Sequence, residues 1–248
     1  MTNIGIELEC EGAKEAKNVK DWMVVNEPML QGGVEYVLKK PLKGKALEEA
    51  VNNLCDKLDV EKFTQRCSTH IHLDVRDMNL TQIMNLVTVY VCFERIILSL
   101  VQEERVGNLF CLPVYDSLAV EDILIEVAKG TKDIYKLPLE GWKYCSINLA
   151  SIGRLGSLEF RSLHGTKDPD EILRWIGVHQ KLYAYAMTEG LTPDQIIMNT
   201  SVKGGATFFK EVMGEMSEHF EGLDLNNLVE LGMRNAQYFA FSGEWNEW

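Results

Sequence analysis

The chain has 248 residues, of which 46% are hydrophobic and 25% are charged, and its formal net charge is −12. This length and composition are those of a globular protein that buries a substantial core. The negative charge argues against a nucleic-acid partner, because such partners are held through their phosphates by basic surface. A nucleotide triphosphate is not excluded, since a bound divalent cation reverses the local charge.

The cysteines and the apolar segments indicate the compartment. The six cysteines include no C-x-x-C pair, and a chain of this length does not depend on disulfides, so we expect reduced thiols and a cytoplasmic protein. Residues 1–11 show no basic segment followed by an apolar one, so we expect no signal peptide. The most apolar run, 86–101, contains Glu94 and Arg95 and is shorter than the ~20 residues of a membrane span. We therefore expect a buried helix and no membrane partner.

Alternation of apolar and polar residues, interrupted by turn-forming residues, predicts strands in the first two thirds of the chain. These strands are expected over residues 3–9, 22–25, 34–38, 69–75, 144–149 and 156–162, with the last two forming a hairpin. The first strand is expected to be central, because it is short, opens the chain and leads into further strands.

Apolar residues at helical spacing predict helices between these strands and throughout the end of the chain. The helices are expected over residues 45–58, 79–105, 117–129, 169–189, 193–199, 206–219 and 224–237, followed by a loose tail over 242–248.

The order of these elements predicts an α+β fold: an antiparallel sheet with helices on one face and a helical C-terminal third. We expect a single domain over residues 1–248, with a sheet-containing core over 1–166 and a mainly helical part over 167–248. The C-terminal helices should pack on the aliphatic side of the sheet and add few catalytic groups.

Several predicted strands carry polar side chains at positions i and i+2, which lie on the same face of a strand. The residues concerned are Glu7 and Glu9, His70 and His72, Ser146 and Asn148, Glu159 and Arg161, with Glu35 alone on the third strand. A solvent-exposed face is the ordinary explanation of such a pattern. However, these positions contain no lysine, and carboxylates, imidazoles and guanidinium groups are the side chains that bind metals and phosphates. The pattern therefore favours a polar surface that forms a site.

The spacing of Glu7 and Glu9 predicts that a cation is needed. At i and i+2 on one strand the two residues lie about 7 Å apart, and at an effective dielectric constant near 20 their charges repel by roughly 2 kcal/mol. On a central strand beside Glu35 and Glu159 this repulsion is costly unless a cation is bound or protons are retained.

The oxygen-rich set of ligands suits Mg²⁺ or Mn²⁺ better than Zn²⁺. Because magnesium sites commonly complete their coordination with substrate phosphates, the pattern points to ATP. The sequence contains no P-loop, no dinucleotide-binding glycine motif and no recognisable serine or cysteine hydrolase motif.

The same segments resemble the amidoligase family, a branch of the glutamine synthetase and glutamate–cysteine ligase superfamily. In chain order, the matching segments are G-I-E-L-E at 5–9, Trp22 followed by G-V-E at 33–35 and P-L at 41–42, C-S-T-H-I-H-L-D at 67–74, Glu94 with 105–111, 144–148, L-E-F-R at 158–161 and G-T at 165–166. The resemblance covers residues 4–185. Two departures are Ser68, where the family has glycine, and the stretch 26–29, which lacks the usual aspartate and offers Glu27.

The resemblance implies a curved antiparallel sheet of the glutamine synthetase type and an ATP-dependent carboxylate–amine ligase that uses Mg²⁺ and an acyl-phosphate intermediate. It implies one metal held by Glu7, His70 and Glu159, and a second, nearer the acceptor carboxylate, held by Glu9, Glu35 and Glu27.

The expected catalytic residues are Arg161, Glu35 and His72. His72 and Arg161 are expected to contact the nucleotide and the transferring phosphate, with Asn148 and Arg105 as further contacts. The substrates implied are small-molecule or peptide carboxylates and amines, and relatives in bacteria and phages suggest such an origin.

Three alternatives remain open at this point. The first is a phosphotransferase of the guanidino-kinase type, which shares this sheet architecture. The second is an ATP- or metal-binding module of the same fold without ligase turnover, and the third is an α+β domain with an acidic face and no site. The identity of the substrates and the oligomeric state are not predicted.

Overall fold

The computed structural model describes residues 1–12, 19–60, 63–117 and 139–241, together with residues 126, 129, 130, 133 and 137. The helix expected over 117–129 lies outside the described residues except at 117, 126 and 129, and the tail over 242–248 lies outside them entirely.

The centre of the fold is an open, antiparallel six-stranded sheet with the order β2-β3-β1-β4-β6-β5. Its strands are β1 (Ile4–Glu11), β2 (Trp22–Asn26), β3 (Gly33–Leu38), β4 (Ser68–Asp74), β5 (Ile147–Asn148) and β6 (Ser157–His164). Every predicted strand is present, and the central position of the first is confirmed, because β1 lies between β3 and β4. The expected hairpin pairs β5 with β6, but a short helix, α4 (Ser151–Leu155), lies between them.

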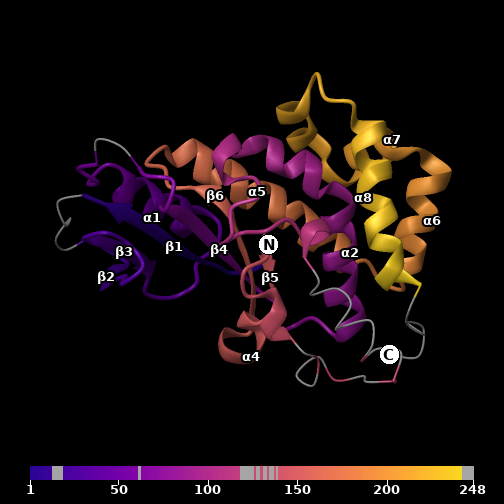
Figure 1. The fold of residues 1–248 in the computed structure, drawn as a ribbon, viewed down its shortest axis with the longest axis horizontal. Helices are drawn as coiled ribbons and strands as arrows, with labels where there is room; N and C mark the ends of the chain where they lie inside the picture. The colour runs from indigo at the N-terminus through magenta and orange to yellow at the C-terminus, as the bar shows by residue number, and fades with distance from the viewer. Residues whose placement is uncertain are drawn as a thin grey trace.

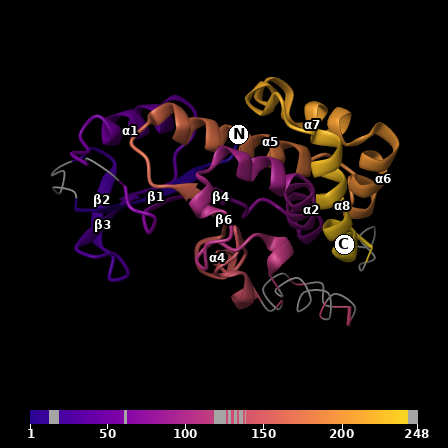
Figure 2. The ribbon, with the colours of Figure 1, turned by 45° about the horizontal axis from the view of Figure 1, so that its top comes forward.

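The two faces of the sheet differ as the alternation predicts. On β1 the aliphatic side chains of Ile4, Ile6 and Leu8 are fully buried, whereas Glu7 and Glu9 on the opposite face are half-buried. Figure 2 shows α1 (Lys45–Cys55) and α5 (Pro169–Ala186) on one side of the sheet and α4 on the other. The polar face is therefore the one that lies away from α1 and α5.

Helix α2 (Leu80–Ile97) forms the second part of the core. It begins with a capping box between Asn79 and Gln82 and is buried along nearly its whole length. By length and composition Leu80–Leu100 could cross a membrane, but 83% of its most apolar stretch is buried inside the protein. This burial agrees with the buried helix that the sequence predicts for this segment.

The expected helix over 79–105 ends earlier, at Ile97, and is followed by the 3-10 turns η1 (Leu98–Leu100) and η2 (Glu103–Arg105). Val101 and Gln102 between these turns are extended. Beyond these turns Arg105 reaches back to β6, where its Nη2 donates to the carbonyl oxygen of Arg161 at 2.9 Å.

The C-terminal helices pack mainly on α2 rather than on the sheet. After α5, which contacts β4 and α1, the chain forms α6 (Pro193–Lys203), α7 (Gly205–Met213), the 3-10 segment η6 (Gly214–Phe220) and α8 (Leu225–Ala240). The single helix expected over 206–219 is divided at Gly214, whose φ of 56° interrupts the α-helix. Figure 1 shows the sheet at one end of the molecule and α6, α7 and α8 at the other.

Candidate active site

The pairing of the strands brings the predicted polar residues together. Glu7 stands opposite His70, Glu9 opposite Glu35, and His72 opposite Glu159, while Asn148 on β5 is also opposite Glu159. The cluster therefore comes from five strands that are neighbours in the sheet, in the order β3, β1, β4, β6 and β5, although its members are far apart in the chain.

A β-bulge lies beside this cluster. The register between β4 and β6 shifts between Thr69 and Ile71, so that Arg161 and Ser162 of β6 both stand opposite His70. A bulge bends a strand and re-aims its side chains. The Arg161 guanidinium consequently reaches Glu159, to which Nη1 donates, and Phe110, whose carbonyl oxygen accepts from Nε at 3.3 Å.

Glu7 is held between the two histidines. Its Oε2 lies 3.4 Å from His70 Nδ1, and its Oε1 lies 3.3 Å from His72 Nε2. Burial by itself would raise the pKa of Glu7, but the hydrogen bonds from His70 and His72 outweigh it and hold that pKa far below its usual value. Glu7 is therefore ionised and ready to bind a cation.

Glu159 is almost fully buried and contacts three polar groups. Asn148 Nδ2 donates to its Oε2 at 2.6 Å, Arg161 donates to its Oε1, and His70 Nδ1 lies 3.3 Å from the same oxygen. Burial raises the pKa of Glu159, but His70 and Arg161 together lower it below its usual value.

Ser68 joins Glu9 to His70. The backbone N–H of Ser68 donates to Glu9 Oε2 at 2.9 Å, its hydroxyl donates to the same oxygen, and the hydroxyl lies 2.7 Å from His70 Nε2. This residue is the departure from the family pattern at the start of the histidine strand. Its hydroxyl adds a polar contact that a glycine could not make.

The surroundings of Glu35 raise its pKa, whereas those of Glu7 lower the pKa of Glu7. Burial, together with the charges of Glu7, Glu9 and Glu27, raises the pKa of Glu35 to about 8. Glu27 lies on the turn after β2, where its Oε1 accepts from the N–H of Met29 at 3.0 Å. A half-buried carboxylate surrounded by others is stabilised by a divalent cation, so the residues fit a metal.

Two groups of side chains offer ligand atoms that lie within 4.8 Å of one another: Glu7 with His72 and Glu159, and Glu7 with Glu35 and His70. Glu7 belongs to both. His72 Nδ1 lies 3.1 Å from Ser157 Oγ, and its buried Nε2 faces Glu7 Oε1 at 3.3 Å. A buried imidazole with one nitrogen anchored and the other facing a carboxylate suits a metal ligand.

Two cavities meet at Glu7. The larger, of about 570 Å³, is lined by Glu7, Glu9, Glu27 and Glu35 and by cationic side chains. These cations are Arg66, Arg105, Lys143, Arg154 and Arg161. The smaller cavity, of about 320 Å³, has Glu7 and His72 at one side and apolar walls that include Val37, Leu38, Pro41 and Leu155.

Arg105 lies at the larger cavity but is 3% exposed. Its guanidinium donates to the carbonyl oxygens of Arg161 at 2.9 Å and of Gln65 at 3.4 Å. These contacts hold the backbone beneath Arg161.

Sequence reasoning missed the ion pair of Glu11 with Arg66. Arg66 Nε and Nη2 donate to the two carboxylate oxygens at 2.7 and 2.9 Å, and Thr64 Oγ and the N–H of Gln31 also donate to Glu11. Hydrogen bonds from Arg66 are the main reason why the pKa of Glu11 falls to about 2. The pair ties the turns that flank the larger cavity to the end of β1. Glu11 continues the i, i+2 series of Glu7 and Glu9, which is the signal that could have found it.

Comparison with known proteins supports the resemblance. A model of the family described as "putative amidoligase enzyme" matches residues 38–183. The matched part contains the histidines of β4 together with Asn148, Glu159 and Arg161, and it begins after Glu7, Glu9 and Glu35. No curated protein matches the chain. Because the family match spans more than half of the 248 residues, the chain belongs to the amidoligase family.

Proposed function

We propose that this protein is an ATP-dependent ligase that joins a carboxylate to an amine through an acyl-phosphate, with Mg²⁺. The observation that carries the proposal is the shared position of Glu7, which belongs to two groups of ligand atoms and lies where two cavities meet. Membership of the amidoligase family supports a ligase.

The two groups of ligand atoms would hold two cations. Glu7, His72 and Glu159 would hold one, and Glu7, Glu35 and His70, with Glu9 beside them, would hold the other. Bound Mg²⁺ would supply positive charge that neutralises the phosphates of ATP and the attacking carboxylate. In this arrangement His72 would share the first cation with Glu159, while His70, for which the resemblance implied that role, also lies within 3.4 Å of both Glu7 and Glu159.

The two cavities would take different substrates. The apolar walls of the smaller cavity suit the flat ring of the nucleotide base, with the phosphates directed toward Glu7 and His72. The larger cavity, with its cationic side chains, suits the acceptor carboxylate. The reacting atoms would then meet at Glu7 and Glu159.

The residues of the site would act in two steps. In the first, a carboxylate oxygen attacks the γ-phosphorus of ATP and ADP leaves, while Arg161 moves from Glu159 to the transferring phosphoryl oxygens. In the second, the amine nitrogen attacks the acyl carbon and phosphate leaves. The amine has to lose a proton, and Glu35, which would be ionised once the cation is bound, is the proposed proton acceptor.

The test is release of ADP by the purified protein with Mg²⁺, ATP, pooled carboxylates and pooled amines. We expect release only when both pools are present. When the active carboxylate is labelled with ¹⁸O, one labelled oxygen should appear in the released phosphate.

Glu159→Gln should abolish this release, while Glu189→Gln, at an exposed glutamate in the turn after α5, should leave it unchanged. A phosphorylated product without free phosphate would establish a phosphotransferase instead. Binding of ATP and Mg²⁺ without any amine-dependent release would contradict ligase turnover.

A further inference from the structure

The larger cavity carries more positive charge than a single acceptor carboxylate needs, and Lys143 and Arg154 supply part of it. Lys143 follows the 3-10 turn η5 (Leu139–Trp142), and Arg154 lies on α4; both side chains are exposed and line the cavity. Lys143 Nζ lies 5.4 Å from the centre of the Tyr144 ring. Neither cation forms an ion pair with a residue that the structure describes. In a chain with a net charge of −12, two such cations beside a cluster of carboxylates require an explanation.

Apolar side chains are exposed at the same cavity. Met29, Phe110 and Tyr144 are 67%, 44% and 48% exposed, and all three line it. Exposed apolar groups beside polar ones are typical of a surface that binds a ligand. A cavity of about 570 Å³ has room for a molecule much larger than a carboxylate of a few atoms.

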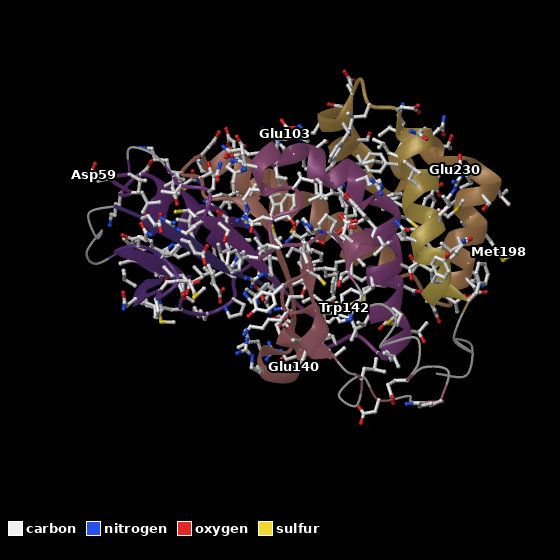
Figure 3. All side chains as sticks on the ribbon, viewed as in Figure 1. Asp59, Glu103, Glu140, Trp142, Met198 and Glu230 are labelled. Carbon is white, nitrogen blue, oxygen red and sulfur yellow. The ribbon has the colours of Figure 1, made fainter. Side chains whose placement is uncertain are left out.

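The segment that carries Lys143 and Tyr144 is held in place from beneath. Trp142 is 1% exposed, the carbonyl oxygen of Tyr144 accepts from the N–H of Leu112 at 2.8 Å, and the N–H of Ser146 donates to the carbonyl oxygen of Leu112 at 2.7 Å. Figure 3 shows Glu140 and Trp142 on this segment, beside α4. Lys143 therefore projects from fixed backbone and can select a ligand by the position of its charge.

We infer that the acceptor carboxylate belongs to an elongated molecule with an apolar portion and a second anionic group, which Lys143 and Arg154 bind. The inference rests on the proposed function, because the first carboxylate is the one that reacts. Charge complementarity carries it: the metal cluster would take the reacting carboxylate, the exposed apolar side chains the apolar portion, and the two cations the second anionic group. The competing explanation is that the same cations bind the phosphates of ATP. In that case, removal of the two cations should change the KM for ATP rather than the KM for the acceptor.

The test uses two matched acceptors with a free C-terminal carboxylate, acetyl-Asp-Leu-Leu and acetyl-Asn-Leu-Leu, with Mg²⁺, ATP and pooled amines. We expect the KM for the dianionic peptide to be lower by about tenfold, the effect of two exposed charge pairs. The double variant Lys143→Glu with Arg154→Glu should abolish this preference and leave the KM for ATP unchanged. Lys210→Glu, an exposed charge reversal on α7, should keep the preference.

Equal KM values for the two peptides in the wild-type protein would overturn the inference. So would a double variant whose KM rises for ATP rather than for the dianionic peptide. Calorimetric titration of both peptides, with Mg²⁺ and a non-hydrolysable ATP analogue, separates the inference from the proposed function. Charge-selective binding without turnover would contradict the ligase function and support the second anionic site, whereas the absence of binding by both peptides would contradict the inference.

Discussion

At the scale of single residues, the site is defined by carboxylates whose environments differ. Glu7 lies between two imidazoles and is readily ionised, whereas Glu35 faces Glu9 across the strand pair and holds its proton. Neither state follows from residue type alone. Both follow from burial and from the charges that the sheet places nearby.

The raised pKa of Glu35 predicts that metal binding releases a proton. Its pKa is about 8, so at pH 7 the carboxyl group is mostly protonated, and a cation that binds the ionised form displaces the proton. Affinity for Mg²⁺ should therefore rise as the pH rises toward about 8. Calorimetric titration with Mg²⁺ in two buffers of different ionisation enthalpy counts the protons released. Glu35→Gln should release about one proton fewer than the wild type, and an unchanged count would show that Glu35 is not the group that titrates.

Glu94 predicts a second pH dependence, away from the metal cluster. It is fully buried on α2, where it accepts from the N–H of Val114 at 2.9 Å and from Ser146 Oγ, and burial raises its pKa to about 7. The folded state thus holds a proton that the unfolded chain loses near pH 4.5, so stability should fall as the pH rises from 4.5 to about 7. The loss should be on the order of 3 kcal/mol.

Urea unfolding between pH 4.5 and 8 measures this slope, and Glu94→Gln, which cannot ionise, should remove most of it. A variant that keeps the full slope of the wild type would assign the pH dependence to another group.

At the scale of elements, the packing of α8 on α2 is the largest contact between helices. Gly232 makes this approach possible, because a Cβ at this position would lie 2.6 Å from the carbonyl oxygen of Val91 and would also collide with that of Cys92. These are backbone atoms of α2, which cannot move aside as a flexible side chain can. The two helices can therefore pack at this distance only with glycine at position 232.

Gly232→Ala should lower the free energy of unfolding by roughly 1–3 kcal/mol, the usual cost of overpacking. Gly153→Ala on α4 is the matched control, since nothing lies within 4 Å of a Cβ there, and it should be neutral or slightly stabilising. Urea unfolding of both variants checks this, and equal stabilities would mean that α8 does not approach α2 as closely as described.

The sequence predicts elements better than it predicts their ends or their contacts. Alternation along β1, β4 and β6 identifies the polar face, because a strand side chain has only two directions. Alternation and helical spacing do not reveal that the helix ends at Ile97 or that Arg105 beyond it contacts a carbonyl oxygen of a distant strand. Pairing of His72 with Glu159 depends on the strand register and on the bulge beside His70, which no local pattern records.

At the scale of the whole molecule, the fold separates stability from chemistry. The helices of the C-terminal third pack on α2 and line neither of the two main cavities, whereas the sheet and the segments on its polar side supply all the described residues that do. A chain with a net charge of −12 gathers carboxylates at the centre of its sheet, an arrangement that bound cations would stabilise.

Counting bound Mn²⁺ by calorimetric titration tests this account most directly. The wild-type protein should bind two ions, as the two groups of ligand atoms predict. Glu159→Gln should weaken one site, and Glu7→Gln, because Glu7 belongs to both groups, should weaken both by at least about tenfold. Undiminished binding of two ions by Glu7→Gln would contradict a metal cluster centred on β1.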